Sequence, residues 1–135
     1  MYTVILYKRP SIEVGFFQPS STTWSNPELV SYYQKIKDDG ILISDIIETT
    51  EDNLIMKKVL TWKDFNTWLA YVEDFIRKFP NYSTEREQFH TDTNSQYSVN
   101  TFTLPENMIT VVGNLNVTVN LTVVDNVAQA TYTLI

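Results

Sequence analysis

The clearest pattern in this chain is a run of alternating apolar and polar residues near the C-terminus. Leucine or valine occupies every second position from residue 115 to residue 123, and asparagine or threonine fills the positions between. The apolar positions are Leu115, Val117, Val119, Leu121 and Val123. Such alternation is typical of a β-strand with one buried and one solvated face. The apolar face needs a cover, supplied either by the rest of the chain or by another subunit.

Shorter patterns predict the elements that precede this strand. Runs rich in β-forming residues predict strands at residues 2–7, 41–48, 54–62 and 96–104. Asn26-Pro27-Glu28 predicts a helix start, because Asn caps, Pro suits the first helical position and the acid meets the positive end of the helix dipole. Gly40 predicts the end of that helix.

A second helix is predicted between the strand at 54–62 and Pro80. Its apolar residues recur at spacings of four, three, four and three, and they mark one face of the helix. They are Phe65, Leu69, Val72, Ile76 and Phe79, with Trp68 and Phe75 widening the face. Thr61 and Asp64 have the spacing of a capping box, with Asp in the place of Glu. Pro80 ends the helix.

The order of these elements predicts the fold class. Up to Leu104 the order is strand, helix, strand, strand, helix, strand, which is the ferredoxin-like βαββαβ arrangement. Thr84 and Glu87 are spaced to cap a short extra helix that ends near His90. We therefore predict an α+β protein with a ferredoxin-like core in residues 1–104 and an antiparallel β extension in residues 105–135.

The extension is predicted to be a meander of strands at 108–112, 115–124 and 127–135. Gly113-Asn114 and Asp125-Asn126 are the expected tight turns. A long strand with few charges and no proline is a hazard at a sheet edge, and natural proteins usually cover it. The extension either covers the chain's own sheet or pairs with a neighbouring subunit. We favour pairing between subunits, and therefore expect a homo-oligomer.

Composition and charge narrow the classes of partner. The 135 residues suit one domain with an appendage, and a hydrophobic content of 43% is ample for a core. The net charge of −6 gives no reason to bind nucleic acid or an anionic membrane, and no Lys or Arg follows Arg86. No stretch has the length of a membrane span, and the first ten residues do not resemble a secretion signal. We expect a soluble protein made in a cytosol.

Candidate chemistry is sparse. The chain has no Cys and only three Gly, so thiolate chemistry and a glycine-rich phosphate loop are excluded. His90 is the only histidine. Glu87 and Asp92 are near it in sequence, but a metal site needs three or four converging ligands, and a surface histidine is the simpler interpretation. Asp45 and Glu48 lie on opposite faces of one strand. We predict no catalytic residues, no metal site and no cofactor.

Four aromatic residues are the candidates for a ligand pocket. Trp62, Trp68, Tyr32 and Trp24, with Tyr33 beside them, would line an apolar pocket between the sheet and the helices. The alternative is ordinary core packing of the same side chains, which we favour.

One segment carries a family resemblance. Val59-Leu60-Thr61-Trp62, followed by Lys63-Asp64-Phe65 and an amphipathic helix, resembles the dimeric α/β-barrel group of ferredoxin-like proteins, which includes antibiotic-biosynthesis-type monooxygenases. The resemblance covers roughly residues 1–104, and it implies a homodimer. Enzymes of that group often carry a histidine on the helix after the tryptophan. Residues 68–73 of this chain hold none, which weighs against an enzyme.

A second resemblance concerns the opening residues 1–10, which are similar to the start of small uncharacterised proteins encoded by tailed phages. It implies a location in the virion or the host cytoplasm, with other virion proteins as further partners. Our first hypothesis is a non-enzymatic structural or interaction protein, a capsid or tail component that assembles through its C-terminal strands. The alternative is a dimeric, monooxygenase-like small-molecule enzyme or ligand-binding protein with an aromatic pocket.

Overall fold

The computed structural model describes residues 1–17, 27–105 and 107–135. Within these residues the chain forms seven strands and three helices. In chain order they are β1 (Tyr2–Lys8), α1 (Pro27–Asp38), β2 (Leu42–Thr49), β3 (Ile55–Trp62), α2 (Phe65–Lys78), α3 (Tyr82–Thr93), β4 (Gln96–Leu104), β5 (Asn107–Gly113), β6 (Val117–Val124) and β7 (Val127–Leu134). The fold is mixed α+β, as the sequence predicts.

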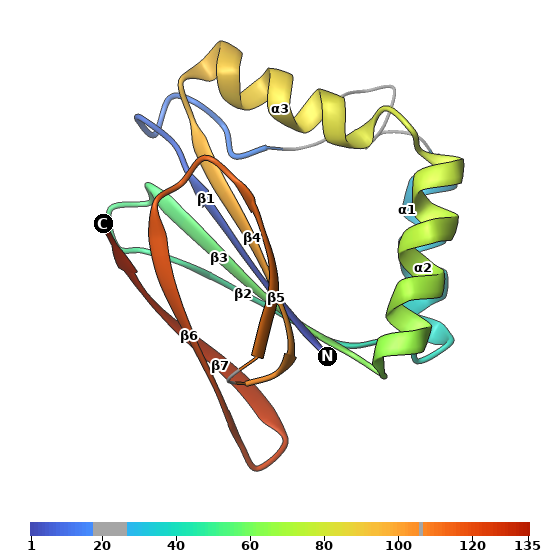
Figure 1. Ribbon diagram of the computed structural model, residues 1–135. Coiled ribbons are helices and arrows are strands. Elements are labelled where there is room, and N and C mark those ends of the chain that lie inside the picture. The colour runs from blue at the N-terminus through green and yellow to red at the C-terminus, as the bar shows by residue number, and fades with distance from the viewer. Residues whose placement is uncertain (18–26, 106) are drawn as a thin grey trace.

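The elements form three layers, with an antiparallel sheet in the middle (Figure 1). The sheet has the strand order β2-β3-β1-β4-β5, and every neighbouring pair in it is antiparallel. The three helices lie on one side of this sheet, and the hairpin of β6 and β7 crosses the other side. The sheet is therefore covered on both faces, and its central strand must carry apolar residues on both.

The central strand β1 meets this requirement. Val4 and Leu6 are fully buried on the hairpin side of the sheet. Val4 packs there with Val59 of β3 and Phe102 of β4 in the core under the hairpin. Tyr7 points to the other face and is also buried, in the core under α3. The residues of β1 thus anchor two separate cores.

The start of α2 differs from the predicted capping box. Asp64 is itself the N-cap, and its side chain accepts a hydrogen bond from the backbone N–H of Thr67 at 2.7 Å. Thr61 is still part of β3 and is paired with Tyr2, so it is not available to cap the helix. The helix ends at Lys78, just before Pro80, as predicted.

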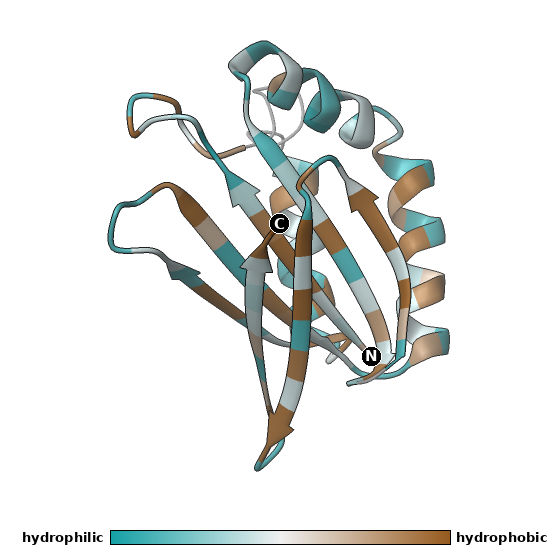
Figure 2. Ribbon diagram, turned by 60° about the vertical axis from the view of Figure 1, so that its left-hand side comes forward, coloured by the Kyte–Doolittle hydropathy of each residue, from teal (hydrophilic) through white to brown (hydrophobic). Residues whose placement is uncertain are grey.

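The face of α2 that the sequence marked is turned inward only in part: Trp68, Val72, Phe75 and Phe79 are half-buried, and the other three residues are exposed. Phe65, Leu69 and Ile76 keep 44%, 39% and 58% of their surface exposed, and α2 shows hydrophobic bands in Figure 2. The helix instead turns its aromatic side inward, where the ring of Tyr71 lies 4.8 Å from that of Trp62.

The three predicted C-terminal strands are present as β5, β6 and β7, but they do not pair as the predicted meander. β5 pairs with β4 and joins the main sheet, whereas β6 and β7 pair only with each other in the described residues. The predicted turn at Asp125-Asn126 is confirmed, and both residues have the positive φ that such a turn requires. Gly113-Asn114 does not join paired strands. The segment stays on β4, because Leu115 N–H donates to the carbonyl of Tyr97 at 3.0 Å.

Two further features depart from a plain βαββαβ order. The main sheet has five strands instead of four, and α3 is a full third helix between α2 and β4. The predicted short helix at 84–90 is therefore longer than expected. It begins at Tyr82 with Asn81 in the N-cap position, and Thr84 lies inside the helix.

Candidate functional site

The predicted aromatic pocket is largely filled by its own side chains. Trp62 is buried, and its indole N–H donates to the hydroxyl of Thr3 at 3.0 Å. Trp68 and Tyr32 pack against the same core, which α1, α2 and the sheet share. Trp24 lies outside the described residues. The three described aromatic residues thus come together, but in a packed core.

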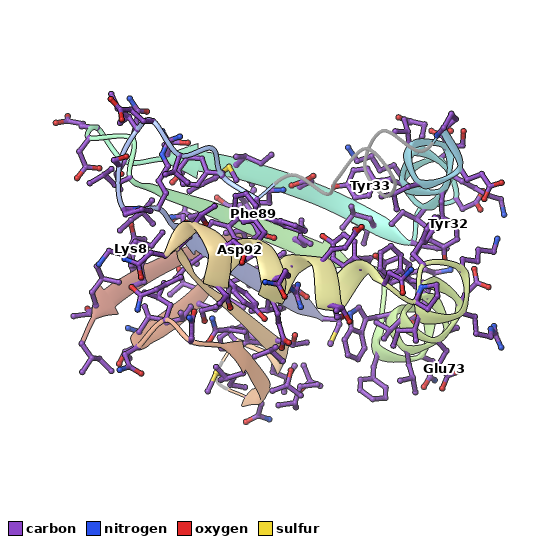
Figure 3. All side chains as sticks on the ribbon, turned by 90° about the horizontal axis from the view of Figure 1, so that it is seen from above. Lys8, Tyr32, Tyr33, Glu73, Phe89 and Asp92 are labelled. Atoms are coloured by element: carbon purple, nitrogen blue, oxygen red, sulfur yellow. The ribbon has the colours of Figure 1, made fainter. Side chains whose placement is uncertain are left out.

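Tyr32 is the one member that reaches an open hollow. The hollow has a volume of about 410 Å³ and is lined by residues of α1 and the end of α2, among them Lys35, Lys78 and Phe79. The hydroxyl of Tyr32 donates to the Asp74 carboxylate at 2.8 Å. Burial, with this acceptor, raises the pKa of Tyr32, and the same hydrogen bond lowers the pKa of Asp74. Tyr32 and Tyr33 project from α1 in Figure 3.

The residues predicted for an oligomer interface face the chain's own sheet. Leu115 and Leu121 are buried in the single chain. Val119 and Val123 are partly buried, and they pack with Leu121 on the core that contains Val4, Val59 and Phe102. Val117 keeps part of its surface exposed. The chain itself supplies the cover for this face, so only the three valines keep area for another subunit.

A cluster of aromatic and cationic side chains lies under α3, and we call it the α3 cluster. Its members are Tyr7, Tyr82, Arg86, His90 and Tyr97. The guanidinium of Arg86 lies 4.8 Å from the ring centroid of Tyr97 and 5.7 Å from that of Tyr82. Residues 82, 86 and 90 share one helix face because they are four apart. That spacing is visible in the sequence and is the signal that would have found the cluster.

His90 is buried, which corrects the expectation of a surface histidine. Its ring stacks at 5.7 Å on Tyr7 and lies 4.5 Å from the ring of Tyr97. Nδ1 lies 2.6 Å from the carbonyl oxygen of Arg86, and it must be the donor, since a carbonyl only accepts. Burial lowers the pKa of His90, although this hydrogen bond opposes the shift. The imidazole is therefore held neutral.

A second polar group lies between α1 and the sheet. The hydroxyl of Tyr33 donates to one carboxylate oxygen of Asp45, on β2. Burial and this hydrogen bond raise the pKa of Tyr33. Burial also lowers the pKa of Lys58 on β3, and the charge of Asp45 opposes that shift. The other oxygen of Asp45 and Nε of Arg86 are buried without a hydrogen-bond partner in the described residues.

A second open hollow of about 340 Å³ lies beside the α3 cluster. It is lined by Glu87, His90 and Thr91 of α3, by Tyr97, by Gly113 at the end of β5, and by Asn114 after it. One carboxylate and one neutral imidazole are too few to bind a metal ion. In residues 1–17, 27–105 and 107–135, no three side chains of the types that ligate metals gather closely enough to hold one.

The most exposed apolar surface built from sheet is β5. All seven of its residues are exposed, and Val111 and Val112 keep 53% and 45% of their surface. The strand lies at one edge of the sheet, so its outer backbone groups pair with no strand of the described chain. No charged residue occurs from Asn107 to Val124. Such an edge is a template for a further strand.

The opposite edge, formed by β2, is built differently. It carries Asp45 and Glu48, and its register with β3 is interrupted between Leu42 and Ser44. Glu48 is engaged by Lys57 of β3 at 3.1 Å. The register of β5 with β4 is interrupted as well, so the difference between the two edges is charge, a usual device that keeps an edge strand from pairing further. Only the β5 edge lacks a charge.

Comparison with protein-family models, with curated proteins and with solved structures finds no match to this chain. None of the helices in the described part of the chain has the length and apolar character needed to cross a membrane.

Proposed function

We propose that this chain is a non-enzymatic structural or interaction protein that assembles through its C-terminal β region. The observation that carries the proposal is the exposed, uncharged edge strand β5. An edge strand offers backbone N–H and C=O groups in a row, and a partner strand satisfies them all at once. The exposed apolar side chains of Val111 and Val112 add area that association would remove from water.

The charge distribution supports the same function. The chain carries a net charge of −6, so two copies repel each other over most of their surfaces. From residue 107 to residue 135 the only charged side chain is Asp125. Association of two copies through residues 107–135 therefore brings fewer like charges together than association through the rest of the chain. The hairpin, which the sequence predicted as the contact, covers β1, β3 and β4 and leaves β5 exposed.

Two finer parts of the proposal concern the type of core fold and a role in a phage virion. A ferredoxin-like core is supported by the alternation of β1 to β4 with α1 and α2, while β5 and α3 depart from that plan. A role as a capsid or tail component of a tailed phage rests on the resemblance of residues 1–10 alone. In that setting the partners are other copies of the chain and other virion proteins.

A second candidate function is a small-molecule enzyme or ligand-binding protein of the monooxygenase-like kind. The observation that favours it is the pair of polar groups under the helices, where Lys58 has a lowered pKa and Arg86 and Asp45 each hold a buried atom without a partner. The predicted pocket residues Trp62 and Trp68 line neither of the two hollows described above. The edge strand is therefore the stronger basis.

Light scattering on the purified chain, over a range of concentrations, tests the assembly function. We expect the unmodified chain to exceed the mass of one chain and Val111→Lys to return it to one chain. Ile47→Lys is the matched control, because Ile47 has the same 53% exposure on the opposite edge. A chain that stays single at every concentration would overturn the proposal, and so would loss of assembly in the Ile47 variant alone. Truncation after Leu104 is less informative, because it uncovers Val4 and Phe102.

A further inference from the structure

The β5 edge limits the kind of strand that can pair with it. The edge has no charged residue, so it offers nothing to select a charged peptide. It favours a short, uncharged, apolar strand with no proline, since proline cannot donate to a ladder. The sequence of β5, Asn-Met-Ile-Thr-Val-Val-Gly, is itself such a strand. β6 and β7 are also uncharged and free of proline, but each has buried residues, so β5 is the described strand of this kind that a second copy presents with every residue exposed.

We infer that β5 pairs antiparallel with β5 of a second copy about a two-fold axis, so that two five-stranded sheets join into one sheet of ten. This inference rests on the proposed function and names its partner as a second copy of the chain. A two-fold contact uses the same patch on both copies and closes on itself. The outer edges of the joined sheet would both be β2, whose charged residues Asp45 and Glu48 oppose further growth.

The register follows from the irregularity of β5. Its pairing with β4 shifts at Phe102, and the regular part runs from Thr110 to Gly113. Opposite residues of an antiparallel pair point to the same face of the sheet. A two-fold axis perpendicular to the sheet keeps each side chain on its own face. One residue of β5 must therefore lie opposite the same residue of the second copy. An axis at Val111 passes through a residue position and lies within the regular part of β5. It places Val111 opposite Val111 of the second copy and Thr110 opposite Val112.

Single cysteines test the register, because the chain has no Cys of its own. Opposite Cα atoms of an antiparallel pair are about 4.5–5.5 Å apart. Disulfides span Cα separations of roughly 4.4–6.8 Å. Under mild oxidation we expect most of Val111→Cys to shift from the one-chain to the two-chain band on a non-reducing gel. Val124→Cys, on β6 with a similar exposure of 58%, should stay at one chain.

The outcomes separate this inference from the proposed function. If scattering shows assembly but neither Thr110→Cys, Val111→Cys nor Val112→Cys cross-links faster than Val124→Cys, the β5 pairing is wrong and the assembly function stands. A wild-type chain that is single at all concentrations overturns both. Amide exchange on the unmodified chain is a second readout: we expect β5 amides to gain protection as concentration rises while β2 amides do not, and equal behaviour of the two edges would overturn the pairing.

Discussion

The ammonium of Lys57, on β3, donates a hydrogen bond to the backbone carbonyl of Ala130, on β7, at 2.6 Å. The same group forms an ion pair with Glu48 at 3.1 Å. One side chain thus links the β2–β3 edge of the sheet to the hairpin that covers it. Ala128 and Ala130 are buried beside it, and their small side chains let β7 approach the sheet closely.

Lys57→Met keeps most of the apolar stem and removes the charged donor. We expect a loss of about 1.5–3 kcal/mol in the free energy of unfolding, as for a hydrogen bond to a charged group. Lys35→Met is the control, because Lys35 and Asp39 form an exposed pair at 3.6 Å on α1. That variant should change stability by no more than about 1 kcal/mol. Urea unfolding of the two variants makes the comparison, and equal losses would contradict the role of Lys57.

Gly113 is required by its conformation and its surroundings. Its φ is +111°, and a Cβ at this position would collide with the backbone carbonyl of Tyr97. We expect Gly113→Ala to cost about 1–3 kcal/mol through backbone strain, with the collision adding to it. At Gly15 an added Cβ meets nothing within 4 Å, so Gly15→Ala should be neutral or slightly stabilising. Thermal unfolding of the pair checks this, and similar midpoints would refute it.

His90 should make stability depend on pH near neutrality. Burial lowers the pKa of His90 in the folded state from its ordinary value of 6.5. As the pH falls, His90 is therefore protonated at a higher pH in the unfolded chain than in the folded chain. The free energy of unfolding therefore decreases between pH 7 and pH 5, with a slope of at most about 1.4 kcal/mol per pH unit from one proton. His90→Phe should flatten the profile in that window. Urea unfolding at several pH values measures both slopes, and identical slopes would exclude His90 as the cause.

The orientation of α2 makes a further prediction. Ile76 lies on the exposed side of the helix, so Ile76→Gln should change the free energy of unfolding by no more than about 0.5 kcal/mol. Tyr71 packs between Trp62 and Phe75, and Tyr71→Ala should cost about 3 kcal/mol or more. Chemical denaturation of both variants distinguishes the two faces. The opposite ranking would mean that the helix buries its aliphatic stripe.

Local elements were the part of the fold that the sequence could predict. The strand at 96–104 matches β4, the hairpin of β2 and β3 lies where expected, and Pro80 follows the end of α2. These features depend on periodicity and on residues that act within a few positions. The pairing of β5 with β4, and not with β6, is a choice between two neighbouring strands that no local pattern contains.

The candidate site was harder to predict for the same reason. Alternation from 115 to 123 indicates a dry face, but it cannot say which surface covers that face, and here the covering surface includes Val4 and Phe102. The spacing of Tyr82, Arg86 and His90 did mark one helix face. Its burial became visible only once Tyr7 and Tyr97 were placed beneath it. The exposure of β5 follows from strand order alone, which is a property of the whole sheet.

The central position of β1 sets the order in which the chain can fold. Its neighbours are β3, which ends at Trp62, and β4, in which Phe102 stands opposite Tyr2. During synthesis β1 has no partner until β3 has left the ribosome, and its second side stays open until β4 follows. Sheets built from such distant pairings fold slowly, on the scale of milliseconds to seconds. Until then Val4 and Leu6 lie open to chaperones and to neighbouring nascent chains.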